Sequence, residues 1–228
     1  MMGADLDGFP LMSVRGITKT FERGPERVTA VDDVSLEVHA GEVVGLVGPS
    51  GSGKTTLLSV MAGWERPDAG AIGWEGHEVM PRQLSWSDLA IVPQDLALLE
   101  ELPNGENVTL ALRMARRPGE RNAERLEVLG ELLGITELML RMPSQVSLGA
   151  QQRIAFARAL ALSPRIVLAD EPTAHQDEAS TKQLLRAIRV AADAGTAFVI
   201  ATHSGEVVRQ LDRVVAMRDG RVVNASSG

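Results

Sequence analysis

The sequence predicts an α/β fold, in which helices flank a mostly parallel sheet that is interrupted by a helical insert. Three short apolar runs carry this prediction: VVGLV (43–47), RIVLAD (165–170) and TAFVIAT (196–202). Such runs are typical of strands buried on both faces, as in parallel sheets. Between the first two runs, the residues from about 95 to 162 are mostly helical in pattern, including NAERLEVLGELLG (122–134). We therefore expect an α/β core with a helical insert.

Two further strands are expected before the first apolar run. Residues 11–21 (LMSVRGITKTF) alternate between apolar and polar positions, and residues 34–42 (VSLEVHAGE) have the pattern of a second strand that ends in a turn. Residues 67–93 are predicted to form short strands and turns, because glycine recurs through them.

The first apolar run is followed by a glycine-rich loop and a helix. GPSGSG (48–53) interrupts the strand, and KTTLLSVMAG (54–63) has helical spacing and ends at a glycine. EASTKQLLRAIRVAADAG (178–195) is predicted to be an amphipathic helix closed by a glycine. RVVAMRDGRVV (213–223) is expected to form a hairpin that turns at its Asp-Gly pair.

Composition excludes several classes of protein. The chain has 228 residues, a net charge of −7 and no cysteine. Without a basic cluster, nucleic acid is not an expected partner, and thiol chemistry is excluded. Residues 1–10 lack the cationic start and apolar core of a signal peptide. No stretch approaches the ~20 apolar residues that span a bilayer. We expect a soluble protein whose membrane role would come through a partner.

The loop after the first apolar run matches a phosphate-binding motif. GPSGSGKTT (48–56) fits G-x-x-x-x-G-K-[ST], in which backbone N–H groups surround phosphates, Lys54 reaches the β and γ oxygens and Thr55 offers its hydroxyl to Mg²⁺. An accidental glycine-rich turn is the alternative, but the strand before and the helix after provide the context that the motif requires. The expected nucleotide contacts are Gly48, Ser50, Gly51, Ser52, Gly53, Lys54, Thr55 and Thr56.

Two carboxylates follow the second apolar run, in RIVLADEPT (165–173). Asp170 is expected in the Mg²⁺ shell, and Glu171 is expected to polarise a water for attack on the γ-phosphate. The alternative is a pair of acids in an exposed turn. His203 follows the third run, where a lone histidine is more often structural than catalytic. Gln94, in LAIVPQD, could reach a metal or a water, but alone it supports no function.

Together these motifs resemble the ATP-binding subunit of an ABC transporter, from about residue 11 to residue 224. The resemblance implies a P-loop NTPase core with an antiparallel β subdomain, formed by about 11–94 and 163–224. It also implies a helical subdomain at about 95–162, within a single domain covering 1–228. The subgroup that the chain is most similar to is the lipoprotein-release and macrolide-export type. The motifs, in the family's order, are the phosphate loop, Gln94, SLGAQQR (147–153), VLADEPT (167–173), HQD (175–177) and His203.

The resemblance also implies a role for each matching residue. Phe21 would stack on adenine, and Gln94 would sense Mg²⁺ and the membrane partner. Glu171 would be the catalytic base, and His203 would contact the γ-phosphate. Asp177 would lie in the loop that joins two copies. The cofactors would be ATP and Mg²⁺. The partners would be a transmembrane permease and a second ATP-binding subunit, identical or paralogous, at the inner face of the cell membrane.

One motif departs from the family, whose signature is L-S-G-G-Q. Ser147 and Gly149 match it, and they would bind the γ-phosphate held by the opposite subunit. Leu148 and Ala150 replace a glycine and the glutamine, and HQD (175–177) stands where N-L-D is common. Leucine would be strained if position 148 required positive φ. We therefore expect a weakened anion site, a weak ATP-bound dimer and slow hydrolysis.

Three functions remain to be weighed. The first is an ATPase subunit that drives a separate permease, on which the helical insert would dock. The second is an ATP-binding regulatory or low-activity subunit of the same fold, which the altered signature favours. The third is another P-loop enzyme, such as a small-molecule kinase, for which the sequence offers no acceptor site. Leu98 and Leu99, just after Gln94, either belong to the core or face a groove that receives a permease helix.

Overall fold

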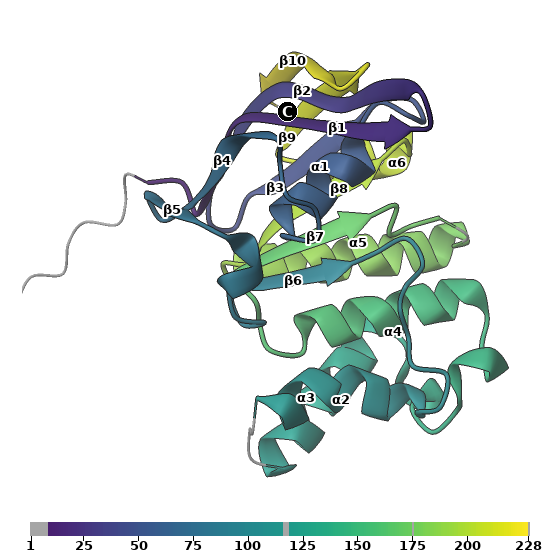
Figure 1. Ribbon diagram of the computed structural model, residues 1–228. Coiled ribbons are helices and arrows are strands. Elements are labelled where there is room, and N and C mark those ends of the chain that lie inside the picture. The colour runs from purple at the N-terminus through teal and green to yellow at the C-terminus, as the bar shows by residue number, and fades with distance from the viewer. Residues whose placement is uncertain (1–8, 116–118, 175, 228) are drawn as a thin grey trace, which may run out of the picture.

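Two sheets and a group of helices form successive layers of the molecule (Figure 1). The structure is a computed structural model, and it describes residues 9–115, 119–174 and 176–227. His175, the first residue of the HQD motif, lies outside the described residues. The predicted α/β fold with a mostly parallel sheet is confirmed. No helix among the described residues is long and apolar enough to cross a bilayer.

The larger sheet has six strands, five of them parallel. It places β3, which leads into the glycine-rich loop, between β8 and β9. β10 is antiparallel to β9 and closes one edge. From edge to edge the strands are β10 (Arg221–Ser227), β9 (Arg213–Arg218), β3 (Val43–Val47), β8 (Ala197–Thr202), β7 (Ile166–Asp170) and β6 (Leu89–Val92).

The central strands of this sheet are buried on both faces, as their apolar runs predicted. In β7, Ile166 and Leu168 belong to the core shared with the second sheet, and Val167 and Ala169 belong to the core under the helices. Successive side chains of a strand point to opposite faces, so a strand between two cores must be apolar throughout.

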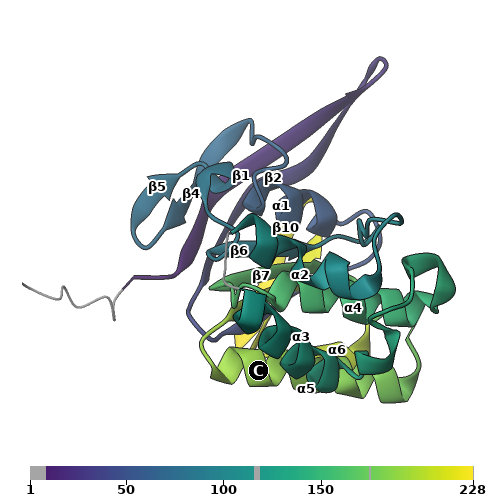
Figure 2. The ribbon, with the colours of Figure 1, turned by 90° about the horizontal axis from the view of Figure 1, so that it is seen from below.

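The second sheet is antiparallel, with strand order β2-β1-β4-β5. Its strands are β1 (Met12–Arg23), β2 (Glu26–Val38), β4 (Ala69–Trp74) and β5 (His77–Val79). The expected start of the second strand, at residue 34, was wrong by eight residues. The first four residues of β2 are exposed and bury no apolar face, so their pattern does not show the strand. The β1–β2 hairpin projects as an arm (Figure 2).

Helix α1 (Lys54–Met61) lies between the two sheets, where Leu57, Leu58 and Met61 are fully buried. The remaining helices cover or extend the other face of the larger sheet (Figure 1). They are α2 (Asn104–Met114), α3 (Gly119–Leu133), α4 (Leu148–Leu160), α5 (Glu178–Asp193) and α6 (Gly205–Val208), with 3-10 turns at Pro81–Gln83, Thr136–Leu138 and Pro143–Gln145.

The leucine-rich loop after Gln94 is fixed by a buried asparagine. Asn107 accepts a hydrogen bond from the Leu99 N–H (2.8 Å) and donates to the carbonyls of Leu99 (2.9 Å) and Leu102 (3.0 Å). Leu96 is buried in the core and Leu98 packs partly against it, whereas Leu99 is 42% exposed. The core interpretation therefore holds for Leu96 and in part for Leu98, and Leu99 is free to contact a partner.

Candidate functional site

The glycine-rich loop joins β3 to α1 in a conformation that only glycine allows at two points. Gly51 and Gly53 have φ of +80° and +99°. A Cβ on Gly53 would collide with the carbonyl oxygen of Ala30 in β2. Left-handed backbone turns successive N–H groups inward, and the start of α1 adds its own unpaired N–H groups. The loop therefore has the form of an anion-binding cradle.

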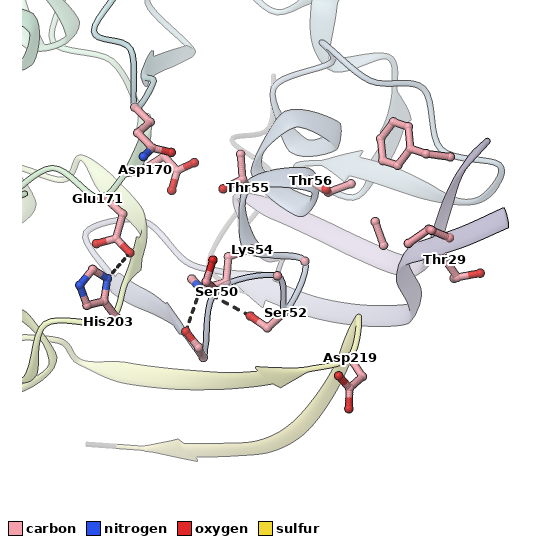
Figure 3. A pocket seen from close by; sticks show the side chains of 17 residues that line it. Thr29, Ser50, Ser52, Lys54, Thr55, Thr56, Asp170, Glu171, His203 and Asp219 are labelled. Atoms are coloured by element: carbon pink, nitrogen blue, oxygen red, sulfur yellow. Dashed lines mark hydrogen bonds and ion pairs between the residues drawn. The ribbon is translucent and has the colours of Figure 1, made fainter. Parts of the chain in front are cut away.

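Lys54 is the first residue of α1, and its side chain is almost completely buried. Its ammonium donates to the carbonyls of Gly48 (2.8 Å) and Pro49 (3.0 Å) and to Ser52 Oγ (3.5 Å). The charge is thus satisfied by the loop itself, at the edge of the cradle (Figure 3).

The hairpin between β9 and β10 braces the same loop. The Gly220 N–H donates to the carbonyl of Ser52 (3.2 Å), and the Asp32 N–H donates to the carbonyl of Gly220 (2.9 Å). The predicted Asp219–Gly220 turn is confirmed, with φ of +51° and +78° at its two residues. Three segments far apart in sequence therefore meet at the cradle.

Two carboxylates stand opposite the loop at the carboxyl end of β7. Asp170 is buried, and this burial raises the pKa of its carboxyl, an effect that the hydrogen bond from Thr55 opposes. The charge of Glu171 also raises the pKa of Asp170, and that of Lys54 lowers it. The carboxyl end of a parallel sheet is where α/β folds bind ligands.

Glu171 and His203 form a pair across adjacent strands. Residue 170 is in register with residue 201, which brings the residues after β7 and β8 together. Oε1 of Glu171 lies 2.7 Å from Nδ1 of His203 (Figure 3). The Glu171 backbone has φ of +49°, and its N–H donates to the Ala201 carbonyl (2.9 Å). Non-glycine residues rarely adopt this conformation, and it is frequent at functional sites.

These groups line one cavity of about 870 Å³. It unites most of the residues that the sequence singled out. Sequence reasoning missed two parts of the wall: Val28, Thr29 and Ala30, which lie in the unpredicted first half of β2, and Asp219, whose turn was predicted but not its place at the cavity. The lining residues are Phe21, Val28, Thr29, Ala30, Gly48, Ser50, Gly51, Ser52, Gly53, Lys54, Thr55, Thr56, Gln94, Asp170, Glu171, His203 and Asp219.

The structure does not bring Ser147 and Gly149 to this cavity. Ser147 caps α4 and accepts a hydrogen bond from the Ala150 N–H (3.3 Å). Leu148 is the first helical residue, so its backbone is right-handed and the suggested strain is absent. Its side chain is 44% exposed, next to the exposed Ser147.

The strand, glycine loop and helix of this site, with acidic residues at the end of the neighbouring strands, define a P-loop nucleotide-binding protein. A family model described as "ABC transporter" matches residues 31–174, and the chain belongs to that family. It is an ATP-binding subunit with ATPase activity, as the sequence predicted, and the alternative of another class of P-loop enzyme was wrong.

Named relatives agree with this assignment. The chain is 38% identical to the lipoprotein-releasing system ATP-binding protein LolD 2 of Caulobacter vibrioides, a match that covers 93% of this chain and 96% of the relative. It is 32% identical to the ABC transporter ATP-binding protein YknY of Bacillus subtilis, over 96% and 97% of the two chains. The expected likeness to lipoprotein-releasing subunits is confirmed.

A solved structure has the same fold. It is the dimeric, post-hydrolysis state of the ATP-binding cassette MJ0796 bound to ADP and Pi. Its TM-score to this chain is 0.87 with 29% sequence identity, and the match covers 95% of this chain and 98% of the other.

Proposed function

We propose that the cavity binds ATP with Mg²⁺ and hydrolyses it, and that the chain thereby drives a separate membrane permease. The observation that carries the proposal is the Glu171–His203 pair, 2.7 Å apart, facing the phosphate loop across one cavity. A carboxylate with a histidine partner, opposite an anion cradle, is suited to activating a water for attack on a bound phosphate.

The phosphate loop would hold the triphosphate through backbone N–H groups. Three hydroxyl residues of the same loop and the start of α1 also line the cavity: Ser50, Ser52 and Thr56. Lys54 would exchange its bonds to the Gly48 and Pro49 carbonyls for the β and γ oxygens, which carry full negative charge. Phe21 would stack on the adenine, because its aromatic ring lines the cavity.

Thr55, Asp170 and Gln94 would hold Mg²⁺. These residues fit the ion, because a buried carboxylate beside a hydroxyl is an oxygen-donor set that a divalent cation would satisfy. When bound, Mg²⁺ would neutralise charge on the β- and γ-phosphates. No group of three or more His, Cys, Asp or Glu residues that could hold a metal ion occurs among the described residues.

Glu171 would accept the proton of the attacking water, and His203 would contact the γ-phosphate. Because Nδ1 of His203 pairs with Glu171, its Nε2 is the ring atom left to face the nucleotide. Only 16% of the Glu171 side chain is exposed, so the carboxylate is shielded from bulk water and kept near its partner.

A second ATP-binding subunit, identical or paralogous, would complete the site. Ser147 and Gly149 lie outside the chain's own cavity, which is consistent with contact to a nucleotide held by the opposite copy. Subunits of this kind work with a membrane permease, and we place the protein at the inner face of the cell membrane through that partner. The domain boundaries given above, with a helical subdomain at 95–162, form part of this proposal.

The low-activity alternative rests on Leu148 and Ala150, the two departures in the signature. Glu171 and His203 are both present and paired, which argues against complete loss of hydrolysis. Under this alternative, the subunit would therefore hydrolyse ATP slowly rather than not at all.

Substitution of Lys54 tests nucleotide binding. Lys54→Ala removes the cation that would meet the β and γ oxygens, so Mg-ATP affinity should fall at least about tenfold, or ~1.4 kcal/mol. Isothermal titration calorimetry measures this. Lys182→Ala is the matched control, because that lysine is exposed and pairs with Glu178 on the surface of α5. Unchanged affinity in Lys54→Ala would rule out this site.

A further inference from the structure

The aromatic ring at the base end of the cavity is held by a lysine. Nζ of Lys19 lies over the Phe21 ring, 5.1 Å from its centroid. Phe21 lines the cavity, whereas Lys19 does not. The ammonium therefore contacts the ring without being part of the cavity wall. A cation within about 6 Å of an aromatic face is attracted by the ring's quadrupole.

Lys19 is itself anchored. Only 13% of its side chain is exposed, and its ammonium donates to the carbonyl of Arg66 (2.9 Å) and pairs with Glu65 (3.2 Å). Since the ammonium has two polar partners in the neighbouring segment, its position over the ring is restrained.

The anchoring segment is joined to β1 by the backbone as well. The Thr20 N–H donates to Oδ2 of Asp68 (2.7 Å), and the Asp68 N–H donates to the Thr18 carbonyl (2.8 Å). The segment also follows α1 directly, and the Glu65 N–H donates to the carbonyl of Ser59 in that helix (3.1 Å). Helix α1 begins at Lys54, so one continuous piece of structure connects the phosphate cradle with the ring.

We propose that Lys19 is a positioning residue for nucleobase recognition. It fixes the plane of the Phe21 ring at a set distance from the phosphate loop, so that stacking on the base and binding of the triphosphate occur together. Phe21 has no hydroxyl to anchor it, and the lysine supplies the anchor instead. The inference rests on the proposed function, because it takes the cavity to be an ATP site.

The test compares a ligand that has a base with one that has none. The affinities of the full chain for Mg-ATP and for magnesium tripolyphosphate are measured by competition with a fluorescent ATP analogue. Lys19→Ala should weaken ATP about threefold to tenfold, the range expected for a lost cation–π support, and should leave tripolyphosphate within about twofold. In steady-state hydrolysis, KM for ATP should rise while kcat at saturating ATP stays the same.

Two further variants separate positioning from folding. Lys19→Arg keeps a cation over the ring and should restore ATP affinity. In a Phe21→Ala background, Lys19→Ala should have no additional effect on ATP binding, because the ring through which it acts is gone. Arg113→Ala, which breaks a surface pair with Glu106 in α2, is the control and should bind both ligands normally.

Three results would overturn the inference: equal weakening of ATP and tripolyphosphate, unchanged ATP affinity in Lys19→Ala, or additive effects of the two substitutions. If the wild-type chain itself bound neither ligand, the proposed ATP site would be wrong, and this inference with it. That outcome can be distinguished from the three above, because it would be seen in the wild-type chain, before any substitution at position 19.

Discussion

Asp170 illustrates how a single functional residue opposes stability. Its carboxyl is buried, and the burial raises its pKa above the ordinary value, which means that the charged form is disfavoured in the folded chain. Above the folded pKa the native state carries this cost in full. The cost disappears as the pH falls through the folded pKa and below the unfolded one, where both states are protonated.

Asp170→Asn should therefore stabilise the nucleotide-free protein at neutral pH. We expect Tm at pH 7 to rise, by about 2–4 °C for each kcal/mol gained in a domain of this size, and the gain to shrink on acidification. The same variant should lose Mg²⁺-dependent hydrolysis. Thermal denaturation at several pH values, without nucleotide, measures the effect.

Asp177 provides a control of opposite sign. The backbone hydrogen bond from Ser180 at the start of α5 is the main cause that lowers the pKa of its carboxyl. Its stabilising effect is present above the unfolded pKa and is lost as the pH falls through the folded pKa. Asp177→Asn should thus lower Tm at neutral pH. If Tm rose in both variants, the loss of one negative charge, and not the burial of Asp170, would explain the change in stability.

At the scale of elements, the start of α4 decides how the altered signature acts. Leu148 has ordinary helical backbone, and Ser147 still caps the helix, so the helix start is intact. The change is instead an exposed leucine side chain beside Ser147, where the family has a glycine. A bulky group there would keep a phosphate from approaching the N–H groups closely.

Restoring the signature should increase turnover. Leu148→Gly combined with Ala150→Gln should raise kcat by up to about tenfold, which requires only ~1.4 kcal/mol, with little change in the ATP affinity of the monomer. Ala150 is buried, so Leu148→Gly alone is needed to separate the side-chain effect from strain at position 150. Flat or lower turnover in both variants, with normal Tm, would mean that the native loop is already competent.

The elements also show which parts of the fold a sequence can predict. β3, β7 and β8 were predicted because each fills two cores and is apolar throughout. The first half of β2 was not, because its first four residues are exposed and their pattern reflects no core. That half contributes Thr29 and Ala30 to the cavity, so the part of the site built on it was missed.

Within the site too, a local motif could be predicted from the sequence, whereas contacts between distant segments could not. The phosphate loop is a local motif, and its residues lie together because they are adjacent in the chain. The contact of Gly220 with Ser52 joins segments that are far apart in sequence, and it depends on sheet order. The Glu171–His203 pair depends on the register of β7 with β8, which periodicity does not specify.

At the scale of the whole molecule, the proposed two-subunit assembly can be tested through Glu171. Glu171→Gln retains shape but is a poor base, so the variant should bind Mg-ATP, stall before hydrolysis and accumulate as a dimer. Sedimentation velocity with and without Mg-ATP measures this. A strict monomer at high protein concentration would argue against assembly from identical subunits and would favour a paralogous partner.

The permease contact can be tested on the loop that Asn107 fixes. Leu99 is 42% exposed, so Leu99→Glu should abolish stimulation of the ATPase by the cognate permease while basal activity and Tm stay normal. Leu96→Glu is the matched control: that side chain is 5% exposed, and burial of an unpaired charge should lower Tm sharply. If the permease stimulated the ATPase activity of Leu99→Glu fully, Leu99 would not be part of the permease contact.

The order of strands in the larger sheet has a consequence for biosynthesis. β3 ends at Val47, but both of its neighbours, β8 and β9, begin only at Ala197 and Arg213. A ribosome that adds about 5–20 residues per second needs roughly 8–30 s for the roughly 150 residues between β3 and β8. During that time the nascent chain carries a phosphate loop whose strand has two open edges, which are prone to pairing with other chains. Because ATP stabilises only a chain that can bind it, the ligand cannot protect the nascent segment before β8 and β9 have been made.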